Sequence, residues 1–201
     1  PPQQRLARLF PMRSALLDPR ALLDRILPAA LPNTFDALEI PLDVIATDIG
    51  KREAVVFREG DLRHAIAASI AIPVVFAPIY DADRTLADGG LVNPLPYDVL
   101  EGRCDITVAV DVSGAASEAV IGPRPGITTM ITQSVQILQK RIIRERLGYH
   151  PPDIYIDVDL DRYAAFQFHR IEAILDDAAP AKAELKRRLR RVLTSETVTP
   201  G

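Results

Sequence analysis

The chain has 201 residues, 48% of them hydrophobic and 25% charged, which is enough for one globular domain with a substantial core. We therefore expect residues 1–201 to form a single domain or most of one. The formal net charge of −3 gives no reason to expect nucleic acid as a partner, and no apolar run approaches the roughly 18 residues of a membrane span. The one cysteine, Cys104, excludes an internal disulfide, and we expect it to be a buried small hydrophobe.

The first 33 residues predict short helices that pack on a core. Apolar residues have helical spacing at positions 6–10 and again at 22–27. Between them, Asp18-Pro19 is typical of a helix start with proline in the first turn.

Residues 42–47 are apolar at both odd and even positions, which point to opposite faces of a strand. This predicts a strand covered on both faces and hence a sheet with helices on either side. Residues 54–57 would be the second strand of a hairpin. Asp48 lies at the end of the first strand and is a candidate catalytic carboxylate. An aspartate before a glycine more often closes a turn, so we favour that role.

The stretch from 62 to 96 is the most informative part of the chain. Asp61 is suited to cap a helix that begins at Leu62. Leu62, Ile66 and Ile70 lie on one side of this helix, and the small residues that dominate 65–71 would let neighbouring backbone approach its other sides. Two prolines then bound residues 73–78 and predict an extended or turning path. A short strand at 84–87 leads into a turn at Asp88.

Asp88-Gly89-Gly90 would place a carboxylate rigidly yet within reach of a ligand. Two glycines supply positive φ and let another backbone come close. A turn in which Asp88 only caps its own backbone is the commoner meaning of the tripeptide alone. The segments around it therefore decide how it should be interpreted.

Their order resembles the patatin-like phospholipase family, in its C-terminal portion. The resemblance rests on Ala-Ala-Ser at 67–69, Ile-Pro-x-x-Phe-x-Pro at 72–78 and Asp-Gly-Gly-Leu-Val-Asn-Pro-Leu-Pro at 88–96, and it extends back through 40–48 and 57–60. It implies an α/β fold with a three-layer sheet flanked by helices. It also implies a serine acyl hydrolase with a Ser-Asp dyad, no catalytic histidine and no cofactor, acting on a lipid or acyl ester. Asp88 would be the dyad aspartate, and Gly89 and Gly90 its motif turn.

The family's G-x-S-x-G serine elbow does not occur in these 201 residues. The first residue is Pro1, which favours a fragment whose nucleophile and first strands lie outside this chain. Two alternatives stay open: an inactive patatin-like module that binds lipid or protein, and a different α/β binding module in which Asp88 is a turn residue. The upstream sequence would separate the first alternative from an enzyme.

The second half of the chain predicts two strands and a long helix between them. Residues 106–112 are apolar on both faces and end near Asp111, for which a capping role is favoured over a catalytic one. Residues 153–159 alternate cleanly, so that strand has one wet face. Its three aspartates lack the glycine and the glutamate of a calcium loop, so we expect no metal there.

The long helix is expected to bury one apolar stripe and to stop near Gly148. The stripe consists of Ile127, Ile131, Val135, Leu138 and Ile142.

The last helices are expected at 164–178 and 181–192, and the second is distinctly basic. A solvated face is its ordinary explanation, whereas contact with anionic lipid headgroups would suit a lipid hydrolase. The sequence does not determine the location of the protein, and a cytoplasmic or peripheral membrane location is favoured. Neutralisation of its basic residues would test the membrane contact. The basic residues are Lys182, Lys186, Arg187, Arg188, Arg190 and Arg191.

Overall fold

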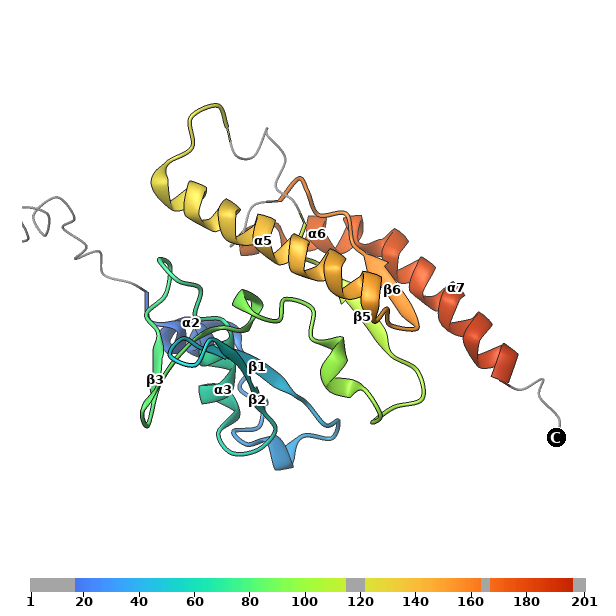
Figure 1. Cartoon of the computed structure of the whole chain (residues 1–201), viewed down its shortest axis with the longest axis horizontal. Helices are drawn as coiled ribbons and strands as arrows, with labels where there is room; N and C mark the ends of the chain where they lie inside the picture. The colour runs from blue at the N-terminus through green and yellow to red at the C-terminus, as the bar shows by residue number, and fades with distance from the viewer. Residues whose placement is uncertain (1–16, 115–121, 164–166, 197–201) are drawn as a thin grey trace, which may run out of the picture. The chain divides into compact units, whose positions relative to one another are not determined.

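The computed structural model describes residues 17–114, 122–163 and 167–196, and it confirms the mixed α/β class (Figure 1). Its contacts divide the chain into two compact units, and the boundary in the sequence lies between Gly89 and Gly90. Among the described residues, no helix combines the length and the apolar composition that a membrane span needs. The expected helix at 6–10 lies outside the described residues.

The first unit contains a four-stranded antiparallel sheet with the order β2-β1-β4-β3. Its strands are β1 (Val44–Asp48), β2 (Glu53–Phe57), β3 (Ile79–Asp81) and β4 (Arg84–Asp88). All five residues of β1 are buried, as a strand covered on both faces requires. The predicted hairpin of β1 and β2 is confirmed, with Val44 opposite Phe57.

Two helices of the first unit begin where local capping rules place them. Asp18 caps α2 (Pro19–Ile26) by accepting the Arg20 N–H at 2.9 Å, and Asp61 caps α3 (Leu62–Ser69) by accepting the His64 N–H at 2.9 Å. Helix α3 packs on the sheet through its alanines, which let the helix and strand backbones approach closely. The core cluster consists of Leu23, Ala46, Ala67, Ala68, Ile79 and Leu86.

The second unit is built on a parallel pair of strands, β5 (Val108–Asp111) and β6 (Ile154–Asp157), connected by α5 (Ile127–Tyr149). Their register places Val108 beside Ile154 and Asp111 beside Asp157. The alternation of β6 is confirmed, because Ile154, Ile156 and Val158 are all buried. The prediction that both faces of the first strand are covered is wrong at Val110, which is 42% exposed.

The predicted inward stripe of α5 is wrong. Ile127 and Leu138 are 79% and 64% exposed, whereas Ile143 is 2% exposed and packs with Leu95 and Ala109. The helix is turned so that Lys140 reaches a buried carboxylate, as described below, and this takes the isoleucine-rich stripe out of the core. Gly148 does not end the helix, which continues for one more residue.

The remaining elements differ from the sequence predictions at their boundaries. After the 3₁₀ turn η3 (Tyr97–Leu100), Cys104 is exposed rather than buried, in the connection that leads to β5. The penultimate helix α6 (Ile171–Asp177) follows the 3₁₀ turn η4 (Phe168–Arg170) and so starts later than expected. The last helix is α7 (Ala179–Glu196).

Candidate functional site

Asp88 is the last residue of β4, and the backbone on both sides of it is fixed. In the register it lies opposite Ala46 of the buried strand β1. Its N–H donates to the carbonyl of Ala71 at 3.0 Å, and its carbonyl accepts the Thr47 hydroxyl at 2.8 Å. Its side chain is half-buried. The strand therefore ends in a carboxylate whose backbone cannot easily move.

Gly89 is buried directly against the backbone of β1. It opens the 3₁₀ turn η2 (Gly89–Leu91), and a Cβ at this position would lie 2.3 Å from the carbonyl oxygen of Ile45. The expected positive φ is not found at Gly89. Glycine is required here for the close approach of two backbones, which is the other reason that the sequence suggested. Gly90 opens the second unit and is half-buried.

Asp48, the rival carboxylate, closes a turn as favoured. It is 3% exposed, and its Oδ1 accepts the N–H groups of Gly50 at 2.9 Å and Lys51 at 3.1 Å. Such hydrogen bonds hold the chain between β1 and β2 in its hairpin.

The segment after the glycine pair is fastened to α5 within the second unit. Asn93 is 5% exposed and donates from Nδ2 to Asp98 Oδ1 at 2.9 Å. Arg146 donates from Nη1 to Asn93 Oδ1 at 2.7 Å and to Asp98 Oδ1 at 2.9 Å. The residues that follow the motif therefore have a fixed path.

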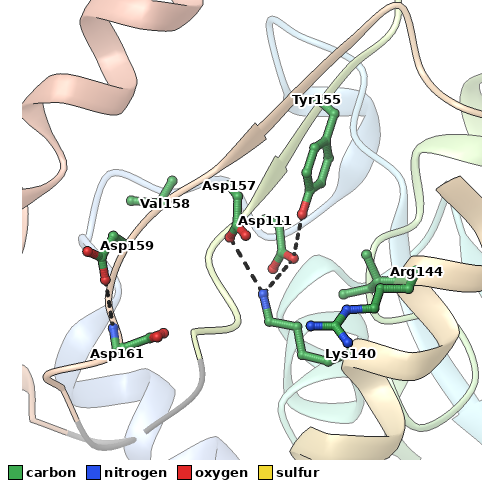
Figure 2. A pocket seen from close by; sticks show the side chains of 9 residues that line it. Asp111, Lys140, Arg144, Tyr155, Asp157, Val158, Asp159 and Asp161 are labelled. Carbon is green, nitrogen blue, oxygen red and sulfur yellow. Dashed lines mark hydrogen bonds and ion pairs between the residues drawn. The ribbon is translucent and has the colours of Figure 1, made fainter. Parts of the chain in front are cut away.

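A second group of polar side chains gathers around Asp111 at the carboxyl ends of β5 and β6. Figure 2 shows Lys140 between two carboxylates: its Nζ lies 2.9 Å from Asp111 Oδ2 and 3.5 Å from Asp157 Oδ1. The Tyr155 hydroxyl donates to Asp111 Oδ2 at 3.1 Å. Ser113 donates to Asp111 Oδ1 through its N–H at 2.9 Å and through its hydroxyl at 2.5 Å.

These contacts explain why Asp111 is ionised and Tyr155 is protonated. Burial alone would raise the pKa of Asp111, but hydrogen bonds from Ser113 and Lys140 and the charge of Lys140 outweigh it, so the pKa lies below its usual value of 3.8. Burial and the negative charges of Asp111 and Asp157 raise the pKa of Tyr155, so the phenol stays protonated and donates. The capping role favoured for Asp111 is confirmed through Ser113.

The sequence did not indicate the other partners of Asp111. Lys140 lies on the side of α5 that hydrophobic spacing assigned to solvent, and Tyr155 on the face of β6 that was expected to be wet. A cavity of about 350 Å³ opens beside the group, and Arg144, Asp159 and Asp161 also line it. Within it, Lys140 of α5 is paired with Asp111 of β5 and Asp157 of β6, so these contacts hold the helix against the strands. Among the described residues, no cluster of His, Cys, Asp or Glu could hold a metal ion.

Comparison with known proteins finds similarity in the first half of the chain. The family described as "Patatin-like phospholipase" matches residues 3–101, which include Asp88, Gly89 and Gly90. Uncharacterized NTE family proteins of Mycobacterium tuberculosis (strain H37Rv) and Mycobacterium bovis are each 37% identical over 116 residues, which is 57% of this chain and 32% of theirs. Another uncharacterized NTE family protein of Mycobacterium tuberculosis is 34% identical over 56 residues, 28% of this chain and 10% of its own.

The chain thus spans about a third of the length of the curated relatives that match it over the longest stretch. The matched region contains the whole antiparallel sheet, the caps of α2 and α3 and the aspartate-glycine turn at the end of β4. Through residues 3–101, this chain is similar to the patatin-like phospholipase family.

Proposed function

We propose that this chain is the aspartate-bearing part of a patatin-like serine acyl hydrolase that cleaves lipid esters with a Ser-Asp dyad. Asp88 is the base of the dyad, Gly89 and Gly90 form its turn, and the nucleophilic serine lies outside residues 1–201. The substrate is a lipid or another acyl ester. On this proposal, residues 1–201 alone do not turn over substrate.

The observation that carries the proposal is the way in which Asp88 is held. Its N–H and carbonyl are bonded to Ala71 and Thr47, and the next residue has no room for a side chain against Ile45. A general base must keep its position to within a fraction of an ångström, and rigid backbone on both sides favours that. The carboxylate nonetheless remains only half-buried.

In the proposed reaction, Asp88 does the work that an imidazole does in a triad. A serine hydroxyl is a weak nucleophile near neutral pH, so Asp88 accepts its proton as the oxygen attacks the acyl carbonyl. The bond to the leaving alcohol breaks, and the alcohol takes up the proton that Asp88 accepted from the serine. Asp88 then takes a proton from water, whose oxygen attacks the acyl-serine ester. The bond between the acyl carbon and the serine oxygen breaks, the fatty acid is released, and the serine oxygen takes the proton back from Asp88.

The test is Asp88→Asn in the longer protein that contains this chain and the serine elbow. The change keeps the shape of the side chain but removes its basicity, so we expect hydrolysis of a p-nitrophenyl acyl ester and of a phospholipid to fall by about 10²–10⁴-fold. The matched control is Asp83→Asn, because Asp83 is exposed on the turn that joins β3 to β4. That variant should keep its activity.

Circular dichroism and thermal melting of all three proteins establish that Asp88→Asn is folded. If folded Asp88→Asn hydrolyses as fast as the parent, Asp88 is not the base and its turn is only structural. If the parent itself hydrolyses neither ester, the proposal fails in favour of a lipid- or protein-binding module.

A further inference from the structure

Helix α7 has an apolar inward side and a basic outward side. Its inward side packs against the buried residues of β6, which runs alongside it (Figure 1). The inward residues are Ala181, Leu185, Leu189 and Val192. The outward side carries six exposed basic residues, here called the basic face: Lys182, Lys186, Arg187, Arg188, Arg190 and Arg191.

Acidic side chains of the described residues form ion pairs with only two of the six basic residues of the basic face. Glu184 forms ion pairs with Arg187 and Arg188, and Arg188 also donates from Nη1 to the carbonyl of Tyr155 at 3.1 Å. The other four cations of the face have no ion-pair partner among the residues that the structure describes. Lys182, Lys186, Arg190 and Arg191 therefore offer their charge to something outside this unit.

The spacing of these cations destabilises the helix through repulsion between like charges. Lys182, Lys186 and Arg190 follow one another at intervals of four residues, as do Arg187 and Arg191. Like charges at this spacing lie side by side and repel, so the pattern destabilises an isolated helix. The chain as a whole has a formal net charge of −3, so this positive charge is a local concentration. An anionic partner would remove the repulsion.

We propose that the basic face docks on a membrane rich in anionic lipid headgroups. The 18 residues of α7 make a straight array about 27 Å long, which suits a flat, repeating anionic surface. Nucleic acid is the poorer fit, because α7 has no aromatic side chain on which a base could stack. The choice of lipid rests on the proposed function, since a lipid hydrolase must meet its substrate at a membrane.

The contact is electrostatic rather than inserted. The apolar residues Leu185 and Leu189 are occupied against β6, so they are not available to enter the acyl region. Binding should therefore require anionic headgroups and weaken steeply as salt is added.

The experiment is co-sedimentation of residues 1–201 with vesicles of ether-linked lipids, which contain no ester to hydrolyse. Vesicles of phosphatidylcholine alone are compared with vesicles that contain phosphatidylglycerol, at low and at high salt. A variant with Gln at the four unpaired positions is expected to lose about tenfold or more of its binding to the anionic vesicles. The control removes four positive charges elsewhere and should bind as the parent does. Its substitutions are Arg25→Gln, Lys51→Gln, Arg124→Gln and Arg141→Gln.

Each contrary result overturns the inference. Equal binding by the parent and the α7 variant, or an equal loss in the control, removes the basic face from the contact. Equal binding to neutral vesicles removes the electrostatic basis. Tight binding of a short RNA without vesicle binding makes the partner a nucleic acid. Because no turnover is measured, vesicle binding without hydrolysis in the longer protein would reject the proposed function and keep the docking surface.

Discussion

Gly89 shows how one residue can fix the geometry of a candidate catalytic turn. An added Cβ would meet the carbonyl oxygen of Ile45 at 2.3 Å and the carbonyl carbon at 2.8 Å. Both are backbone atoms of the buried strand β1, so neither can move away without disturbing the core. We expect Gly89→Ala to lower the free energy of unfolding by about 1–3 kcal/mol, as overpacking does elsewhere.

Urea unfolding of residues 1–201, followed by circular dichroism, measures this effect. Gly148→Ala is the matched control, because nothing lies within 4 Å of its added Cβ and it is inside α5. Alanine favours a helix over glycine, so the control should be neutral or up to about 1 kcal/mol more stable. Equal unfolding midpoints for both variants would mean that Gly89 does not approach the backbone of Ile45 in β1 as closely as described.

Residues whose role depends on near neighbours in sequence were predictable. Asp18, Asp61 and Asp48 each accept hydrogen bonds from N–H groups two or three residues ahead, and the sequence predicts all three. Asp111 was predictable only in part. Its bond to Ser113 is local, but Lys140 and Tyr155 lie 29 and 44 residues away, and no local rule connects them.

At the scale of elements, α5 shows where hydrophobic spacing misleads. The stripe from Ile127 to Ile142 predicts the inward side of the helix, yet Ile127 and Leu138 are largely exposed. The helix is instead oriented by Ile143 and by the ion pair of Lys140 with a carboxylate that is 1% exposed. A buried carboxylate without a partner destabilises the fold. The pairing of Asp111 with Lys140 therefore sets the orientation of α5, and the apolar stripe is left largely exposed. The two strands that α5 connects were predictable, because each has a clear pattern of its own.

That brace between α5 and β5 should be sensitive to acid. The pKa of Asp111 is lower in the folded chain than its ordinary value of 3.8, so the unfolded chain binds a proton at a higher pH than the folded one. The stabilisation is therefore complete above pH 3.8 and is lost as the pH falls through the folded pKa. Asp111→Asn should cost about 1–3 kcal/mol at pH 7 and flatten this acid dependence.

Urea unfolding midpoints measured from pH 7 down to pH 3 give the slope. Asp105→Asn is the control, because Asp105 is an exposed carboxylate of the same unit. It should keep the slope of the parent protein. If Asp111→Asn also keeps that slope, another group causes the loss of stability in acid.

For the whole molecule, the boundary between the two units falls inside the Asp-Gly-Gly motif. Asp88 and Gly89 end the first unit, and Gly90 begins the second. The sequence predicts one domain for residues 1–201, and that stays a prediction. The family match ends at residue 101, so the α5, α6 and α7 helices and the parallel strand pair lie beyond it. Composition and periodicity predicted these elements, whereas the resemblance rests on residues between 40 and 96.

The longer protein should contain a reactive serine, and residues 1–201 should not. No serine of this chain is flanked by the glycine pair of a G-x-S-x-G elbow, and the chain covers 32% of the length of the mycobacterial relatives that match it over 116 residues. A fluorophosphonate reagent forms a covalent bond only with an activated serine, so we expect it to label the longer protein and to leave residues 1–201 unlabelled. Asp88→Asn in the longer protein should slow labelling, because the serine loses its base. Mass spectrometry of the digest identifies the modified residue. Labelling of a serine within residues 1–201 would place the nucleophile in this chain, and an unlabelled longer protein would remove the dyad altogether.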